Sequence, residues 1–162
     1  MRHALSARIE RLFQTVPESV VLLLTRFALA AVFWLSGQTK IEGFAFNPVA
    51  DVYEWGWPML KDSTVFLFEY EYALPWIDPT WAAYLATIAE HLLPILLLTG
   101  VLCRLAALGI FAMTLVIQIF VYPDAYALHG TWAALALLLM RQGAGVISVD
   151  YWLNRRAQKT RP

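Results

Sequence analysis

Four long apolar stretches dominate the 162-residue chain. They cover roughly residues 19–37, 81–100, 105–122 and 125–140, and the last can be extended through Arg141. Each has about 16–20 residues, close to what a helix rising 1.5 Å per residue needs to cross ~30 Å of hydrocarbon. The stretches show no period-2 alternation, so they favour membrane helices over barrel strands. The pattern predicts an all-α membrane protein with four transmembrane helices.

The composition supports one small integral membrane domain. Hydrophobic residues make up 60% of the chain and charged residues 15%, whereas about a quarter of the residues in a soluble domain are charged. The formal net charge of zero argues against a nucleic-acid partner, which would require a basic face. The single cysteine, Cys103, excludes an internal disulfide, a CxxC redox motif and a cysteine-based metal cluster. We expect it to be a small apolar filler at a helix end.

Basic residues mark the two ends of the chain and one turn. They are Arg2, Arg8 and Arg11 before the first stretch, Arg104 between the second and third, and Arg155, Arg156, Lys159 and Arg161 after the fourth. Lys and Arg accumulate on the cytoplasmic side, and no small-x-small cleavage site follows the first stretch. We therefore predict a membrane protein with both termini cytoplasmic. It would have an N-terminal segment (1–18), a four-helix domain (19–147) and a basic tail (148–162).

The connection over residues 41–80 is acidic and rich in aromatic residues. Its aromatic side chains include Trp55, Trp57, Phe66, Phe68, Tyr70, Tyr72 and Trp76. Connections of this length are often functional, and amphipathic aromatics belong at the membrane boundary. We expect an external loop made of short helical pieces, acting as a lid or a docking surface. The alternative is an aromatic belt that only anchors the protein.

Glu90 and His91 lie in the middle of an apolar run with no other acidic or basic side chain. A charge at membrane depth costs about 2.5–3.5 kcal/mol on insertion scales, so such residues usually face the protein interior. Arg26 lies ~10 Å, and Glu90 ~15 Å, from the predicted cytoplasmic ends of their helices. This favours an Arg26–Glu90 ion pair. Alternatively Arg26 snorkels to the interface and Glu90 is protonated. Lys40, at the outer boundary, is expected to be an interfacial anchor.

Two neighbours make this site more than a generic polar core. Thr87 lies one turn from both Glu90 and His91, so its hydroxyl shares their side of the helix. Pro94 lacks an N–H and cannot satisfy the carbonyl of Glu90, which predicts a bend and a free acceptor beside the polar pair. In lipid that acceptor must be satisfied by a neighbouring group or by water in a cavity.

Further polar groups lie on the third and fourth helices. Gln118, His129 and Trp132 fall on helical stripes, and Gln118 and His129 lie about 20 Å from the cytoplasmic ends. They predict a polar cluster, although Gln118 also suits interhelical packing alone. His91, His129 and Glu90 are suitable in type as metal ligands but come from different helices, so spacing cannot test a metal or haem site. A proton relay or a quinone pocket, with Trp132 and either Phe33 or Trp34 beside the ring, fits the residue types better.

Several stretches resemble the DoxX family of bacterial membrane proteins. They are Arg26 with Gly37–Gln38–Thr39–Lys40, Phe68–Glu69–Tyr70 with Ala73–Leu74–Pro75, Ala89–Glu90–His91 with Leu98–Thr99–Gly100 and Arg104, Val116–Ile117–Gln118 with Tyr122–Pro123, His129 and Trp132, and Gly143–Ala144–Gly145 with Ser148 and Asp150. Ala144 and Val149 stand where proline and leucine are expected, which bears on the local turn only. The resemblance implies a four-helix inner-membrane bundle, often tied to redox systems. Relatives resemble the small membrane subunit of thiosulfate:quinone oxidoreductase, and others accompany metal-handling or thiol-stress proteins.

The leading functional hypothesis is a membrane subunit that supports quinone-linked electron transfer with a protein partner that holds the redox centre. Its candidate binding residues are Arg26, Thr87, Glu90, His91, Gln118, His129 and Trp132. No catalytic or metal-binding residue is assigned, and quinone is the candidate cofactor. The alternatives are a scaffold or assembly factor that docks a periplasmic partner through the aromatic loop, and a metal-handling or transport accessory.

Overall fold

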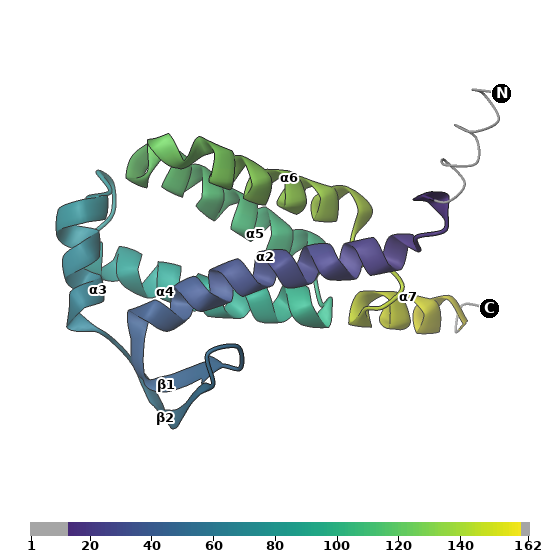
Figure 1. The fold of residues 1–162 in the computed structure, drawn as a ribbon, viewed down its shortest axis with the longest axis horizontal. Helices are drawn as coiled ribbons and strands as arrows, with labels where there is room; N and C mark the ends of the chain where they lie inside the picture. Colours follow the sequence, from purple (N-terminus) through teal and green to yellow (C-terminus); the bar gives the residue numbers. More distant parts are fainter. Residues whose placement is uncertain (1–12, 160–162) are drawn as a thin grey trace.

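The computed structural model describes residues 13–159 and contains a bundle of four long helices (Figure 1). These are α2 (Glu18–Lys40), α4 (Pro79–Thr99), α5 (Cys103–Val116) and α6 (Tyr126–Gln142). A π-helical turn, η2 (Ile117–Val121), extends α5, and a short 3-10 turn, η3 (Pro123–Ala125), precedes α6. All four predicted apolar stretches are helical. Most of the predicted N-terminal segment, residues 1–12, lies outside the described part of the chain.

Three segments among the described residues are long and apolar enough to cross a membrane. They are Glu18–Lys40, Pro79–Thr99 and Cys103–Val121. Helix α6 has 17 residues, at the lower limit of what a bilayer needs. The outward faces carry large apolar side chains that are more than half exposed, including Leu24, Phe27, Leu85, Ile88 and Leu105. Soluble proteins rarely expose apolar surface on this scale, so these faces suit lipid.

The helices form two pairs, α2 with α4 and α5 with α6. The tight turn at Gly100–Leu102 joins the pairs, and here a core that includes Leu29, Leu97, Ile110 and Leu139 holds them together. Toward the opposite end the pairs diverge, and α3 (Asp62–Leu67) lies beside them there (Figure 1). The divergence leaves space between the pairs at that end of the bundle.

Residues 41–60 form a β-hairpin, so the expectation of helical pieces is wrong for this part of the connection. Strand β1 (Ile41–Asn47) pairs antiparallel with β2 (Val52–Leu60), and a bulge interrupts the register between Glu42 and Phe44. Alternating aromatic residues favour strands. They pair across the two strands, with ring centroids 5.9 Å apart for Phe44 and Trp55.

Residues 62–72 of the connection are helical, as predicted. After β2 come α3 and a π-helical turn, η1 (Phe68–Tyr72). The backbone N–H of Lys61 and the hydroxyl of Thr64 both donate to the carbonyl of Lys40, at 3.0 and 2.9 Å. The start of α3 therefore satisfies an orphan carbonyl at the end of α2 and holds the connection against the bundle.

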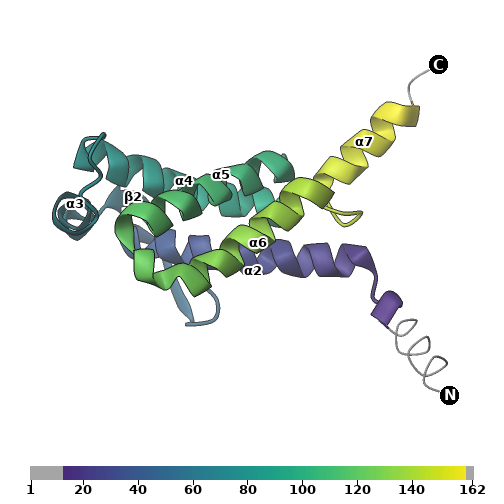
Figure 2. The same cartoon turned by 90° about the horizontal axis from the view of Figure 1, so that it is seen from above.

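The two ends of the bundle differ in charge. The hairpin end carries the acidic connection and the basic end carries Arg104, Arg141, Arg155 and Arg156. Part of the predicted tail forms a helix, α7 (Val149–Lys159), which extends from the basic end where α2 also begins (Figures 1 and 2). The carboxylate of Asp150 accepts from the N–H groups of Leu102 and Cys103, at 2.9 and 3.0 Å. Asp150 thereby caps α5, and Cys103 is a buried filler, as predicted.

Candidate functional site

A cavity of about 600 Å³ lies between the two helix pairs toward the hairpin end. Its wall is mostly apolar and includes Phe33, Phe68, Trp76, Leu85, Met113, Val116 and Trp132. Leu85 and Trp76 line the cavity and are more than half exposed, so the cavity is open at these two side chains and is not fully enclosed.

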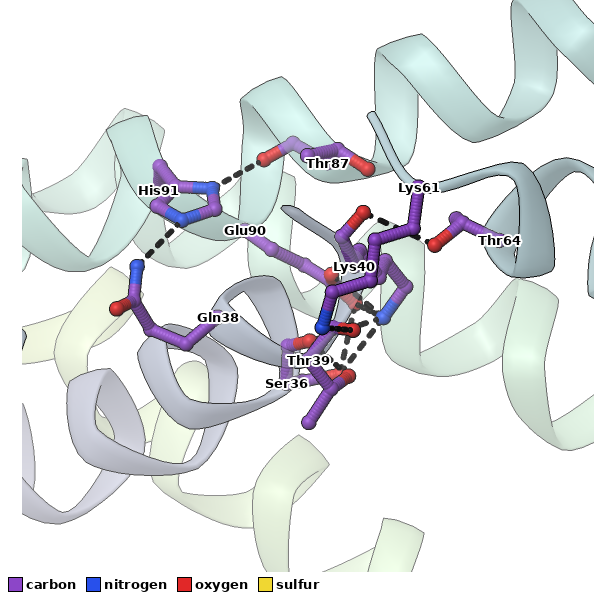
Figure 3. Close-up of polar contacts among 9 residues, drawn as sticks. All are labelled: Ser36, Gln38, Thr39, Lys40, Lys61, Thr64, Thr87, Glu90 and His91. Carbon is purple, nitrogen blue, oxygen red and sulfur yellow. Dashed lines mark hydrogen bonds and ion pairs between the residues drawn. The ribbon is translucent and has the colours of Figure 1, made fainter. Parts of the chain in front are cut away.

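Lys40 and Glu90 form a buried ion pair on the α2 and α4 side of the cavity (Figure 3). Nζ of Lys40 lies 2.9 Å from Oε1 and 2.7 Å from Oε2 of Glu90. The Ser36 hydroxyl donates to Oε1 at 3.0 Å and accepts from Nζ at 3.0 Å. Lys40 and Glu90 are 6% and 4% exposed. Two opposite charges are thus held in an apolar environment with few alternative partners.

The predicted Arg26–Glu90 pair is therefore wrong, and so is the expectation that Lys40 anchors at the interface. Lys40 and Arg26 are 14 positions apart in α2, or about 21 Å along the helix, so Arg26 lies level with the last turn of α4. Its guanidinium donates to four carbonyls, those of Leu97, Leu98, Ala144 and Ile147, at 2.7–2.9 Å. Arg26 joins α2 to the basic end of the bundle and does not balance Glu90.

His91 belongs to a second network that does not line the cavity. The N–H of Phe46 donates to Oε1 of Gln38 at 2.7 Å, so Nε2 of Gln38 is left to donate to His91 at 3.0 Å. Nδ1–H of His91 then donates to the carbonyl of Thr87 at 2.7 Å. This chain ties the hairpin through α2 to α4, and Figure 3 shows the part from Gln38 to Thr87. His91 is thus separated from Glu90 in role, although the two are adjacent in sequence.

Thr87 contributes its carbonyl to this network. Its hydroxyl is buried, and Oγ1 has no hydrogen-bond partner among the residues that the structure describes. Thr87 does not line the cavity. Pro94 lies one turn after Glu90, buried within α4.

Replacing Gly37 with alanine is expected to destabilise the protein by about 1–3 kcal/mol, as overpacking does. A Cβ there would lie 2.8 Å from Cε1 of His91 and 3.1 Å from Cβ of Glu90, so α2 and α4 would have to separate. Thermal unfolding in detergent measures the change.

Gly130→Ala is the matched control for Gly37→Ala. Nothing lies within 4 Å of its added Cβ, so higher helix propensity should stabilise α6 by up to about 1 kcal/mol. If the two variants unfolded at the same temperature, the close packing of Gly37 against His91 would be refuted.

Gln118 and His129 come together, as the predicted polar cluster requires. Oε1 of Gln118 lies 2.8 Å from Nδ1 of His129, and Nε2 of Gln118 donates to the carbonyl of Pro123 at 2.7 Å. His129 lines the cavity beside Trp132, with ring centroids 5.0 Å apart. Trp132 packs edge-on against Phe33 of α2 at 5.5 Å. The α6 side of the cavity therefore presents an imidazole with two aromatic rings next to it.

The hairpin end of the cavity is covered by a cluster that the sequence did not reveal. Tyr72 and Tyr122 both line the cavity, with ring centroids 5.8 Å apart. The Tyr122 hydroxyl donates to Glu71 at 2.5 Å. This carboxylate, together with burial, raises the pKa of Tyr122, so the hydroxyl keeps its proton at neutral pH. The contact ties η1 to the end of η2 and covers the cavity.

Metal ligands are not gathered at this site. Within residues 13–159, no three His, Cys, Asp or Glu side chains lie close enough to hold an ion. His91 and His129, the two histidines considered as ligands, are engaged with Gln38 and Gln118 respectively. The donor set of the cavity is instead one imidazole, one lysine–carboxylate pair and hydroxyl groups, which suits hydrogen bonding to an organic molecule.

These features define a helical membrane protein with a partly polar cavity between two helix pairs. A family model described as DoxX matches residues 21–123, which is more than half of the chain. The chain belongs to the DoxX family, as the sequence resemblance predicted. The match runs from α2 to η3 and includes Lys40, Glu90 and Tyr122. No curated protein and no solved structure matches the chain.

Proposed function

We propose that this DoxX protein is a membrane subunit that binds a quinone-type molecule in the cavity between its helix pairs. A partner protein would hold the redox centre that exchanges electrons with that molecule. The cavity carries the proposal. Its volume of about 600 Å³ is typical of small-molecule sites, which are mostly apolar with a few well-placed polar groups. A quinone has the same division, because its ring oxygens are polar and its tail is apolar.

The residues of the cavity fit such a molecule. Phe33 and Trp132 provide aromatic surfaces for a ring, and His129, Ser36 and the Lys40–Glu90 pair provide hydrogen-bonding groups close to it. The apolar wall toward Leu85 and Val116 would accept the tail. When bound, the quinone would supply two-electron redox chemistry, and the protein would bind the ring, orient it and exclude water.

The proposed arrangement has four spans and both termini in the cytoplasm of a bacterial cell. Together, η3 and α6 form one helical segment over residues 123–142. This is about the length that a span requires. The basic end of the bundle fits the cytoplasmic side and the acidic hairpin end fits the outside, by the positive-inside rule. The cavity would then lie in the outer half of the membrane.

A cavity-filling substitution tests the proposed function. Ala112 lines the cavity on α5, and Ala112→Phe is expected to weaken binding of a short-chain ubiquinone at least tenfold by occupying that space. Ala134→Phe, on the outer face of α6 and away from the cavity, should bind as the wild type does. The measurement is quenching of tryptophan fluorescence in the detergent-purified protein, because Trp132 lies at the site.

Two outcomes would reject the cavity as a quinone site. One is an absence of saturable quenching in the wild-type protein. The other is an unchanged dissociation constant in Ala112→Phe, provided that the variant unfolds at the wild-type temperature. Extraction of co-purified quinone gives an independent check.

A second candidate function is docking of a partner protein through the hairpin. Trp55 and Trp57 on β2 are 74% and 84% exposed, and the hairpin is fixed to α2 because the carbonyl of Phe46 accepts from the indole N–H of Trp34 at 2.9 Å. An exposed and well-anchored aromatic surface suits an interface hot spot. If docking were the function, Trp55→Ala and Trp57→Ala would abolish activity of the complex in membranes, whereas Ala112→Phe would not.

A further inference from the structure

The orientation of the Gln118 side-chain amide determines which ring nitrogen of His129 carries the proton. The carbonyl of Pro123 can only accept, so the amide nitrogen of Gln118 must face it, and the amide oxygen must face His129. An oxygen at that position accepts a hydrogen bond, so Nδ1 of His129 carries a proton. In the neutral imidazole the other nitrogen, Nε2, is then an acceptor.

Nε2 is available to a molecule in the cavity. His129 is 3% exposed and lines the cavity. Nε2 makes no hydrogen bond within residues 13–159. It is also not fully buried, because it is absent from the set of fully buried polar atoms without a partner. It is therefore a fixed acceptor beside the Trp132 and Phe33 rings.

The donors on the α2 and α4 side are already occupied. The three protons of the Lys40 ammonium face the Ser36 carbonyl at 3.3 Å, the Ser36 hydroxyl at 3.0 Å and the Glu90 carboxylate at 2.9 Å. The Ser36 hydroxyl donates to the same carboxylate. A carbonyl oxygen in the cavity would have to displace one of these bonds to gain a donor from this group.

We infer that the cavity selects the reduced, dihydroxy form of its ring ligand over the oxidised, dicarbonyl form. A quinol hydroxyl can donate to Nε2 of His129, whereas a quinone carbonyl at the same position would face that acceptor and gain no hydrogen bond from it. The inference rests on the proposed function, because it names the redox state bound at the same site. One additional hydrogen bond to a neutral acceptor corresponds to about a three- to tenfold difference in affinity.

The test compares three ligands with the same alkyl tail: the quinone, the quinol and the quinol dimethyl ether, which keeps both oxygens but has no donor. Dissociation constants are measured anaerobically at pH 8 on the detergent-purified full chain. The quinol is expected to bind three- to tenfold more tightly than the other two. In His129→Phe all three should bind alike.

Gln118→Leu is a second variant for the case in which His129→Phe does not fold. It keeps the imidazole but removes the group that holds its tautomer, so the preference for quinol should fall while binding remains. Ala134→Phe, on the outer face of α6 and away from the cavity, should keep the preference. Equal affinity for quinol and quinone in the wild type, or a preference that survives both the His129 and Gln118 variants, would overturn the inference and leave the proposed quinone site standing. No binding of any of the three would instead reject the proposed function.

Discussion

Lys40→Met is expected to destabilise the protein by about 3–5 kcal/mol, the usual cost of removing one partner from a buried ion pair. The variant leaves the Glu90 carboxylate in an apolar cavity, where the Ser36 hydroxyl is the one remaining donor among the residues that the structure describes. Thermal unfolding in detergent, followed by circular dichroism, measures the loss.

Two further variants, a single-site control and a double variant, are needed to interpret this result. Lys61→Met removes a lysine at the same end of the bundle whose Nζ donates to the carbonyl of Thr39 at 3.0 Å, and it should change stability by less than about 1 kcal/mol. The double variant Lys40→Met with Glu90→Gln removes both charges and should recover much of the lost stability. If Lys40→Met unfolded at the wild-type temperature, Lys40 and Glu90 would not be energetically coupled.

The sequence predicts the helices and the burial of Glu90 because both follow from local pattern. A continuous apolar run predicts a span at any position in a fold, and a lone carboxylate within it indicates an interior position. The partner of Glu90 depends on how far α2 continues. The apolar pattern stops near Gly37, but the helix runs on to Lys40, and those three residues bring the ammonium to the carboxylate.

The hairpin has a local sequence signal, the alternation of aromatic residues in its two strands. Phe44 and Phe46 alternate on β1, and Tyr53, Trp55 and Trp57 alternate on β2, which is the period of strands. Between them Asn47 accepts at Oδ1 from the N–H groups two and three residues further on, at 3.2 and 3.1 Å, as in turns that Asn favours. Pro58 also lies on β2, where it is tolerated because both strands of a two-stranded sheet are edge strands.

The contribution of Tyr72 and Tyr122 to the cavity lining could not be predicted from the sequence. Tyr72 and Tyr122 belong to segments 50 residues apart that meet through Glu71, and no periodicity links them. Their positions depend on the π-helical turns η1 and η2, which shift the phase of the side chains. The proximity of Gln118 and His129 was predictable, because a short connection between antiparallel helices places residues near its two ends close together.

Arg26→Met is expected to destabilise the protein by at least about 3 kcal/mol. The guanidinium satisfies carbonyls from two separate segments, Leu97 and Leu98 in the last turn of α4 and Ala144 and Ile147 after α6. Carbonyls in the last turn of a helix have no partner within it, and each buried group left unsatisfied costs about 1–3 kcal/mol. Thermal unfolding in detergent gives the stability change, and limited proteolysis of the 143–148 connection reports whether it detaches.

Arg104→Met is the matched control, because Arg104 also donates to carbonyls at the basic end, those of Met140 and Arg141 at 3.1 and 3.4 Å, but from an exposed position. Water can replace those bonds, so stability should change by less than about 1 kcal/mol. Similar losses in both variants would mean that positive charge at this end matters, whatever its position. A large loss confined to Arg26→Met would establish that its buried bonds hold α2, α4 and the connection to α7 together, independently of Glu90.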